Sequence, residues 1–312
     1  MKSKFVRNAA FVLLAGIVCS PAQAQSWPEK QVTFVVPFAA GGGTDAFARP
    51  LAAQLDTQLG KRVLIENRAG AGGTVGASAA SKAAPDGYTF FVGAAHHAIA
   101  PSLYPKLDYD IEKDFVAVAM IARPPQVVVV NPDKVAAKTL KDFIDYVRAN
   151  PGKVNYASAG AGTTHHLAGE LFKIVTKTDL QHVPYRGAGP ALQDLIAGHV
   201  PVMFDGLGTS AGPARGGQLR ALAVAAPKRV TALPDVPTTA EAGLPGYEVA
   251  TWYGLFAPKG TPPEIVARMI KEAWERNGSD VPDVTGPEFA KLVASEVERW
   301  RKVVNEANVK LD

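Results

Sequence analysis

The sequence predicts an α/β protein of two domains whose sheets are mainly parallel. Short β-like runs alternate with helical patterns along the chain, and a turn or a glycine cluster separates most of them. Strands that alternate with helices of this length are typical of βαβ units, which bring parallel strands into one sheet. A chain of 312 residues is long enough for about two domains, and the alternation restarts after Asn131 and Pro132.

The N-terminus has the three parts of a secretory signal peptide. The basic residues Lys2, Lys4 and Arg7 precede the apolar stretch Ala9–Val18, and a small-x-small site ending at Ala24 follows. The apolar stretch is too short for a stable membrane-spanning helix, which needs about 20 residues. We therefore expect a bacterial periplasmic protein cleaved after Ala24. The alternative is an amphipathic N-terminal helix of a cytosolic protein.

Removal of this segment changes the charge and the cysteine content. The whole chain has 33 basic and 29 acidic residues; cleavage removes three basic residues and leaves 30 against 29, a net charge of +1. This near balance removes the main argument for a nucleic-acid partner. Cys19 is the one cysteine and leaves with the segment, so burial of a core alone must stabilise the exported fold.

The first elements follow from local patterns. Gln31–Val36 is an apolar run ended by Pro37 and three glycines, as expected of a buried strand. Asp45–Leu59 carries apolar residues at helical spacing. The next expected elements are a strand at Arg62–Glu66, a helix at Thr74–Lys82, and strands at Tyr88–Val92, Val116–Ile121 and Gln126–Val130.

The same alternation continues to the C-terminus. Thr251–Phe256 indicates a buried aromatic strand that returns to the first domain. Pro262 and Pro263 open a helix through Trp274, and a period near 3.6 over 289–304 predicts a long amphipathic helix packed on a sheet. Between these regions we expect helix Leu140–Arg148, strand Val154–Ala157, helix His165–Thr176, strand Gln181–Pro184, helix Ala191–Ala197, strand Val200–Phe204, a glycine-rich loop, a short helix and strand Leu219–Ala225.

Four loops occupy the same place, the carboxyl end of a strand that leads into a helix. They are 37–45 (PFAAGGGTD), 67–76 (NRAGAGGTVG), 158–166 (SAGAGTTHH) and 205–210 (DGLGTS). Ligands of open α/β sheets bind at this edge, where helix N-termini attract anions. The four loops together predict a shared anion site. The alternative is a set of ordinary turns with Thr44, Thr74 and Thr164 as helix caps.

Two motifs raise the possibility of an enzyme. The loop Gly41–Ala46 fits a relaxed dinucleotide fingerprint, and Glu66 lies near the place of the ribose-binding acid. An exported NAD-type enzyme using this loop is therefore the alternative function. Gly208–Gly212 matches a nucleophile elbow, but that motif needs a later histidine and His199 is the last one. We expect no enzyme and no cofactor.

Several polar side chains can be interpreted either as ligand contacts or as structural residues. The pairs at 96–97 and 165–166 lack the spacing of a metal site, although one histidine of each can line a cleft as a donor. Asp45 lies in a first helical turn, where caps and dipole partners are common. Asp205 follows an apolar strand and either orients a ligand donor or caps the next helix. Arg186 is either a cation for an acidic ligand or a solvated loop residue.

Motifs in a fixed order along residues 28–263 resemble one family. They are PFAAGGGTD, ENRAGAGGTVGA, APDGYTF, SLYPKLDYD, SAGAGTTHHLAGELFK, HVPYRGAGPAL, VMFDGL, LPDVPTTAEAGLPGYE and GLFAPKGTP. On these residues the chain resembles the Bug-type receptors, the extracytoplasmic solute receptors of tripartite tricarboxylate transporters. The resemblance implies a type II periplasmic binding protein fold, with a ligand cleft and hinge between two α/β domains. It places domain 1 at 25–124 plus 250–312 and domain 2 at 125–249, after a signal peptide at 1–24.

The resemblance also implies a function and partners. Such a receptor closes around a small carboxylated solute, such as a dicarboxylate, a tricarboxylate, an acidic amino acid or an aromatic acid, and delivers it to membrane permease subunits. We expect a monomer that binds no nucleic acid. An orphan receptor that signals to a sensor partner is the remaining alternative.

By position, the resemblance assigns contact residues to both domains. His96 and His165 lie beside the motifs and are candidates for selectivity. One departure is the segment 277–286, which is about twenty residues shorter than is usual in the family and puts the completeness of domain 1 in doubt. The implied contacts are Phe38, Gly41, Gly42, Thr44, Asp45, Gly72 and Gly73 in domain 1, and Ser158, Gly162, Thr163, Thr164 and Asp205 in domain 2.

Overall fold

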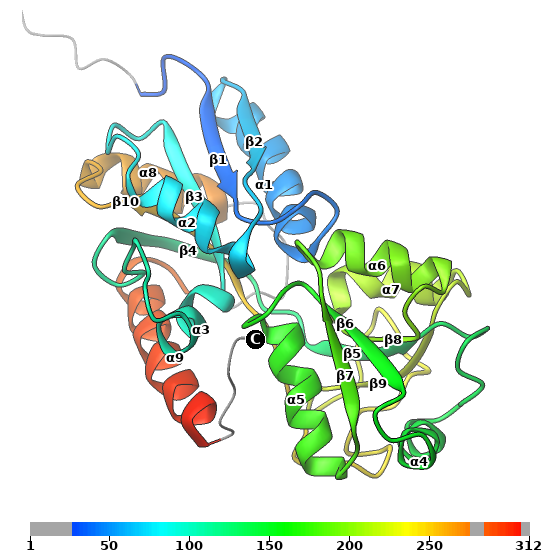
Figure 1. The fold of residues 1–312 in the computed structure, drawn as a ribbon. Coiled ribbons are helices and arrows are strands. Elements are labelled where there is room, and N and C mark those ends of the chain that lie inside the picture. Colours follow the sequence, from blue (N-terminus) through cyan, green and yellow to red (C-terminus); the bar gives the residue numbers. More distant parts are fainter. Residues whose placement is uncertain (1–26, 275–283, 307–312) are drawn as a thin grey trace, which may run out of the picture.

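The computed structural model describes residues 27–274 and 284–306. The predicted signal peptide, its cleavage site and Cys19 lie outside these ranges, as does most of the segment 277–286. Within the described ranges, no helix combines the length and the apolar composition that a membrane crossing requires. The chain forms two five-stranded sheets, each covered by helices on both faces (Figure 1).

The first sheet and its helices, here called the first unit, come from both ends of the chain. Its strands are ordered β2-β1-β3-β10-β4. The strands are β1 (Val32–Val36), β2 (Val63–Asn67), β3 (Thr89–Ala94), β4 (Phe115–Ala122) and β10 (Tyr253–Pro258). The helices are α1 (Gly43–Leu59), the short 3₁₀ turn η1 (Ala71–Gly73), α2 (Thr74–Ser81), α3 (His96–Leu103), α8 (Pro263–Trp274) and α9 (Gly286–Glu306).

The second sheet and its helices, the second unit, come from the middle of the chain. Its strands are ordered β7-β6-β8-β5-β9. The strands are β5 (Gln126–Val130), β6 (Val154–Ser158), β7 (Leu180–Pro184), β8 (Val202–Gly206) and β9 (Arg220–Val224). The helices are α4 (Leu140–Ala149), α5 (Thr164–Thr176), α6 (Ala188–Ala197) and α7 (Leu207–Arg215).

The two sheets share one strand order. In each, a single strand runs antiparallel to both of its neighbours: β10 lies between β3 and β4, and β5 lies between β8 and β9. The sheets are therefore mixed, with four parallel and four antiparallel pairs among the described strands, and the prediction of mainly parallel sheets holds only in part. The chain crosses from β4 to β5 and back to β10, and the two crossings meet in a bridge between Pro125 and Ala250. The predicted α/β fold of two parts is confirmed, while the exact boundaries at 124 and 249 stay a prediction.

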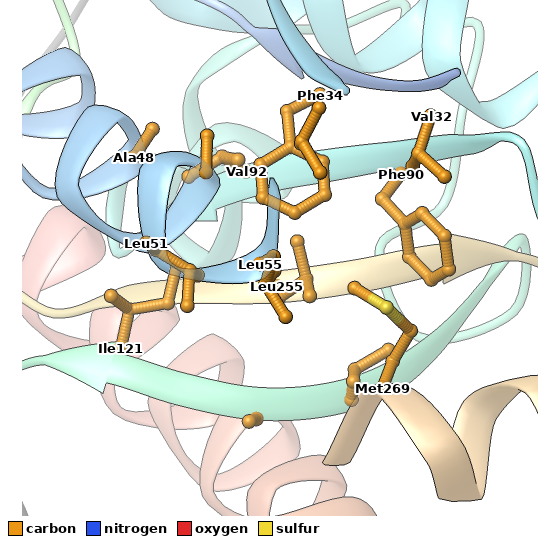
Figure 2. Close-up of a cluster of buried hydrophobic side chains, with 14 of the residues drawn as sticks. Val32, Phe34, Ala48, Leu51, Leu55, Phe90, Val92, Ile121, Leu255 and Met269 are labelled. Atoms are coloured by element: carbon orange, nitrogen blue, oxygen red, sulfur yellow. The ribbon is translucent and has the colours of Figure 1, made fainter. Parts of the chain in front are cut away.

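Apolar side chains fill both faces of each sheet. On one face of the first sheet, Phe34 and Leu255 pack against Leu55 of α1 and Met269 of α8 (Figure 2). On the opposite face, α2, α3 and α9 cover a second cluster that includes Phe256. Two further clusters sandwich the second sheet between α4 with α5 and α6 with α7. These buried layers fix the carboxyl ends of the strands, from which the candidate site is built.

The predicted C-terminal helices are confirmed, and the chain between them rejoins the first sheet. The amide of Met120 in β4 donates to the carbonyl of Val284, and Ala119 pairs with Thr285. Phe289 and Trp300 of α9 are buried against the sheet and α3. The described residues on each side of the shorter segment are therefore part of the first unit.

Three sequence predictions need correction. The helix α3 was not expected, because Pro101 lies inside it and its sequence lacks a helical apolar period. The predicted glycine-rich loop at 205–210 is the end of β8 followed directly by α7. The alternative caps Thr44, Thr74 and Thr164 are wrong, because the helices are capped one or two residues earlier, at Gly42, Gly73 and Thr163.

Candidate functional site

The carboxyl ends of strands from both sheets meet at a small cavity between the two units. Its empty volume is about 190 Å³. The two units therefore lie closed upon each other. The lining residues are Phe38, Gly42, Gly43 and Thr44 after β1, His96 after β3, Ala159 after β6, His165 in α5, Ala188 in α6 and Tyr253 in β10.

Five of the predicted contact residues line this cavity: Phe38, Gly42, Thr44, His96 and His165. The other predicted residues lie at strand ends and helix starts of both units and are not among the lining residues. They are Gly41, Asp45, Gly72, Gly73, Ser158, Gly162, Thr163, Thr164 and Asp205. The predicted convergence of the strand ends is thus present in the structure, and the role of each residue in binding stays a prediction.

The start of α1 presents unpaired amides to the cavity. Gly42 caps this helix without any side-chain hydrogen bond. The amides of Gly43, Thr44 and Asp45 lie in the first turn, where no carbonyl of the same helix can reach them. They donate to no atom of the described residues. These N–H groups and the positive end of the helix dipole make this helix start suited to an anion.

Asp45 supports this loop instead of facing the cavity. Its Oδ2 accepts from the Gly41 amide at 3.0 Å and from Arg49 Nε at 2.8 Å. Its Oδ1 accepts from Arg49 at 2.9 Å and from Asn67 Nδ2 at 3.0 Å. Burial alone would raise the pKa of Asp45, but the hydrogen bonds from Arg49, Gly41 and Asn67 outweigh burial and lower it. Asp45 is therefore a buried, fully engaged carboxylate that fixes the turn before α1.

The start of α5 differs because protein groups already occupy its amides. Thr163 caps the helix and accepts from the His166 amide at 3.4 Å. His166 Nδ1 in turn accepts from the Gly162 amide at 3.1 Å. The Thr164 amide donates to Nδ1 of His96, which belongs to the first unit. Little of the anion-binding capacity of this helix start is left over.

His165 and Asp205 form a buried pair beside the cavity. His165 is 2% exposed and Asp205 is fully buried. His165 Nε2 lies 3.2 Å from Asp205 Oδ1, but the two atoms are misaligned for a hydrogen bond, and neither has another partner among the described residues. Asp205 Oδ2 accepts from the hydroxyls of Thr209 and Ser210, which begin α7. This second oxygen therefore anchors α7, while the first faces His165.

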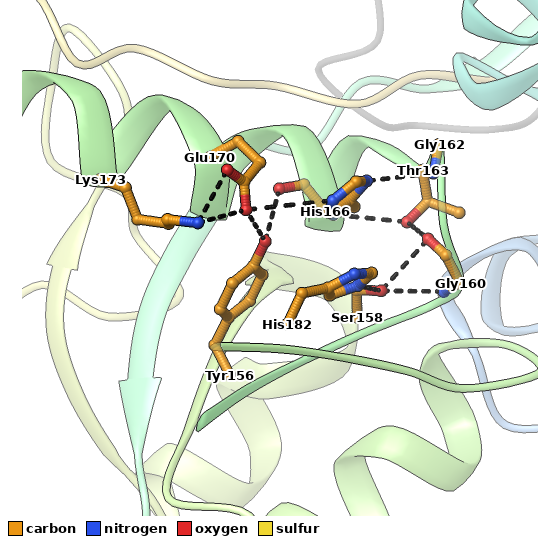
Figure 3. A network of polar contacts seen from close by, with 9 residues as sticks. All are labelled: Tyr156, Ser158, Gly160, Gly162, Thr163, His166, Glu170, Lys173 and His182. Carbon is orange, nitrogen blue, oxygen red and sulfur yellow. Dashed lines mark hydrogen bonds and ion pairs between the residues drawn. The ribbon is translucent and has the colours of Figure 1, made fainter. Parts of the chain in front are cut away.

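A polar network connects the loop between β6 and α5 to residues of β6, β7 and α5 (Figure 3). Ser158 Oγ donates to the Gly160 carbonyl at 3.1 Å and lies 2.6 Å from His182 Nε2. The rings of His182 and His166 stack with centroids 3.9 Å apart. Tyr156 donates to Glu170 at 2.7 Å. Ser158 therefore fixes the start of this loop through its hydrogen bonds to Gly160.

Glycines let the two units approach backbone to backbone. A Cβ on Gly189 of α6 would lie 2.3 Å from the carbonyl oxygen of Ala40, and one on Gly42 would lie 3.2 Å from the Gly189 amide. The Ala39 amide donates to the carbonyl of Arg186 across the same contact at 3.3 Å. The Arg186 side chain is exposed and does not line the cavity. This close contact between the units therefore requires glycine at positions 42 and 189, because a side chain there would push the two backbones apart.

Tyr253 lines the cavity, although its sequence pattern indicates only a buried strand. It is 1% exposed, and its ring stacks on Phe47 of α1 at 5.1 Å. A Cβ on Gly43 would lie 2.0 Å from its hydroxyl, so this hydroxyl reaches the start of α1. Burial, and then the charge of Asp205, raise the pKa of Tyr253, which stays protonated as a donor. The sequence feature that could have indicated this role is the place of Tyr253 as the first residue of the returning strand.

The described residues offer little for the enzymatic alternatives. Within 27–274 and 284–306, no three histidine, cysteine, aspartate or glutamate side chains come together in a way that could hold a metal ion. Glu66, the candidate ribose ligand, has an exposed side chain paired with Arg68 at 2.6 Å. The polar lining consists instead of amides, a hydroxyl, a phenol and two imidazoles, which are groups that bind small ligands by hydrogen bonds.

Two α/β units of equal strand order, with a small donor-lined cavity between them, define a two-domain solute-binding protein. Residues 47–309 match the family described as "Tripartite tricarboxylate transporter family receptor". The chain belongs to this family, and the resemblance to Bug-type receptors with their type II fold is confirmed.

Three relatives illustrate the match. Protein BugT of Bordetella pertussis is 36% identical over 315 residues, which cover 96% of this chain and 96% of BugT. The structure of R. palustris Rpa4515 with adipate is 38% identical, with a TM-score of 0.86 over 91% of this chain and 99% of that one. MatC (Rpa3494) from Rhodopseudomonas palustris, with bound malate, is 39% identical, with a TM-score of 0.83 over 89% of this chain and 100% of that one.

Proposed function

We propose that this protein is a periplasmic receptor that captures a small carboxylate between its two units and delivers it to a membrane permease. The observation that carries the proposal is the start of α1. Three first-turn amides there have no partner among the described residues, and two of them belong to the lining residues Gly43 and Thr44. A carboxylate would accept from these amides and complete the turn.

The lining would hold an anion through hydrogen-bond donors and not through lysine or arginine side chains. No lysine or arginine is among the lining residues, so affinity for an anion must come from N–H and O–H donors. Tyr253, Thr44 and the two lining histidines supply these donors beside the α1 amides. Asp205 lies behind His165 and would orient that imidazole towards the ligand. The adipate and malate complexes of the two relatives support this ligand class.

Capture would proceed by closure of residues 25–124 plus 250–312 onto residues 125–249. The two crossing segments, which meet at Pro125 and Ala250, would form the hinge. The closed cavity is small, which favours a compact acid over a large cofactor. Export would use the segment 1–24, with cleavage after Ala24, and the receptor would act as a monomer.

The first test is a thermal-shift screen of the purified protein. Adipate and malate are the lead acids, with succinate, citrate, glutamate and benzoate as further classes. Adipamide is the control, because it keeps the shape of adipate without the charges. Since a ligand that binds only the native state stabilises it, we expect a rise in Tm with at least one acid and none with adipamide. No shift with any acid, together with no small molecule in native mass spectra of the protein as purified, contradicts the proposal.

Delivery to a permease is tested in cells. Uptake of the radiolabelled acid that gives the largest shift is measured with and without the receptor gene. We expect uptake to fall at least tenfold without the receptor and to return with the wild-type gene. Unchanged uptake would favour the sensory alternative. Tight NAD binding by calorimetry would favour the dinucleotide-binding alternative.

A further inference from the structure

His96 makes a side-chain hydrogen bond between the two units at the cavity. It belongs to the first turn of α3 in the first unit, and its Nδ1 accepts from the Thr164 amide of α5 at 3.1 Å. The Thr164 hydroxyl lies 3.3 Å from the same nitrogen. His96 is 3% exposed and Thr164 is fully buried. The contact exists only while the two units are together, because its donor and acceptor belong to different units.

The donor in this contact fixes the state of the imidazole. A backbone N–H can only donate, so Nδ1 of His96 must offer a lone pair, and the ring proton must be on Nε2. An imidazolium carries hydrogens on both nitrogens and cannot accept this bond. Its charge would also face the positive end of α5, a helix of 13 residues. Protonation therefore replaces an attraction between the units by a repulsion.

The groups that face His96 do not stabilise its charged form. Phe38 packs edge-on to its ring at 5.1 Å, and the His165 ring lies 5.7 Å away. Burial first, then His165 and His97, lower the pKa of His96 well below its usual value. The nearby carboxylate of Asp205, which precedes α7, lies 3.2 Å from Nε2 of His165. The Asp45 carboxylate of α1 is neutralised by Arg49, and Tyr253 of β10 is protonated.

We propose that His96 is a proton-sensitive latch, which holds the two units closed by accepting the Thr164 amide hydrogen and releases them when it takes up a proton. The inference rests on the proposed function, since closure over a carboxylate is what the latch would control. The latch makes closure depend on pH, whereas binding of a carboxylate alone would not require such a dependence. Besides the donor that it offers to the ligand, His96 thus positions the two units and acts on binding through closure.

The direction of the pH effect follows from the two states. In the open form His96 faces solvent with a pKa of about 6.5, and in the closed form its pKa is lower. The latch therefore stabilises closure fully above about pH 6.5 and weakens as pH falls below that value. Between pH 7.5 and pH 5.5 the equilibrium constant for closure should fall roughly tenfold, which lowers the closed population and with it the apparent affinity.

The decisive experiment measures the distance between the units in the ligand-free protein. Spin labels are placed on Val75→Cys in α2 and Ile174→Cys in α5, whose side chains are both exposed. A Cys19→Ser background leaves no other cysteine. Electron-electron double resonance at pH 8.0, 6.5 and 5.5 should show a growing open population in the wild-type background.

Variants separate the latch from a general loss of packing. His96→Asn keeps an acceptor oxygen for the Thr164 amide but does not titrate, so it should stay closed down to pH 5.5. His96→Leu lacks the acceptor and should be open at every pH. His199→Asn, an exposed histidine far from the cavity with a side chain 70% exposed, should behave like the wild type. Circular dichroism at pH 7.5 verifies that each variant is folded.

The outcomes distinguish the latch from the proposed function. Calorimetry with adipate and with malate is run on the same proteins at the same pH values. A pH-dependent distance that His96→Asn abolishes supports the latch even if neither acid binds, in which case the proposed function fails alone. A distance independent of pH in the wild type, or an equal pH dependence in His96→Asn, overturns the latch even if both acids bind.

Discussion

The hydroxyl of Tyr253 lies between the start of α1 and the end of β8, where a Cβ on Gly206 would be 3.7 Å from it. It belongs to the strand that returns to the first sheet, and it lies against the start of α1, where Gly43 leaves room for it. Loss of a hydrogen bond to a charged group costs about 1.5–3 kcal/mol. Tyr253→Phe should therefore weaken carboxylate binding about 10- to 100-fold by calorimetry and leave Tm nearly unchanged. Tyr146→Phe on exposed α4 is the matched control, and equal affinity of Tyr253→Phe and wild type would remove Tyr253 from the site.

His182 makes the second unit sensitive to acid. Burial, followed by the charges of His166 and Lys173, lowers its pKa to about 3. The unfolded chain has a histidine pKa of about 6.5, so neutral His182 stabilises the fold fully above that pH and loses its contribution as pH falls towards 3. We expect the wild-type Tm to fall between pH 6.5 and 4, and His182→Asn to fall less. A fall as steep in His182→Asn as in His199→Asn would contradict this assignment.

Side-chain direction is the part of the site that the sequence left undetermined. The glycine-rich spacing located the loops, because strand ends and helix starts have local signals. Ser158 and Asp45 were expected to contact ligand, yet His182 and Arg49 bind them from outside the cavity. His182 belongs to β7, so no local pattern predicts its contact with Ser158. Arg49 lies one turn along α1 from Asp45, so helical spacing could have indicated that pair. Conversely, Tyr253 lines the cavity because of a strand that joins the sheet from far along the chain.

At the scale of elements, closure depends on the contact between the start of α6 and the turn before α1. Gly189→Ala would place a methyl group 2.3 Å from the carbonyl oxygen of Ala40, which must move the units apart. We expect at least tenfold weaker carboxylate binding by calorimetry, with little change in the Tm of the ligand-free protein. Gly212→Ala is the control, since a Cβ there meets nothing within 4 Å. Unimpaired binding by Gly189→Ala would show that the units need not close this far.

Most elements were predictable to within one or two residues because apolar periodicity and turn residues mark them. Helices α3 and α7 were harder, since Pro101 and Pro213 lie inside them and glycines weaken the helical signal in α7. Their formation depends on packing between strand ends and the neighbouring unit. Helices α1 and α2 are capped by glycine instead of the predicted threonine: Gly42 packs against the backbone of Gly189, and Gly73 has a left-handed φ of 94° that favours glycine.

At the scale of the whole molecule, the two units differ in how the chain builds them. The second sheet uses one continuous stretch, whereas the first needs β10 between β3 and β4. We expect a fragment of residues 125–249 to unfold cooperatively by circular dichroism. A fragment of residues 27–124 should not, and joining 250–312 to it through a short glycine-serine linker should restore cooperativity. Cooperative unfolding of 27–124 alone would contradict the importance of β10.

The central position of β10 also sets an order of events during biosynthesis. Chains emerge from the N-terminus, so β3 and β4 are made early but lack the strand that joins them until the whole second unit has followed. During that interval their facing edges have unpaired backbone groups, which invite association with other chains. The second unit can fold first, while the first unit stays incomplete and needs protection until β10 has been made.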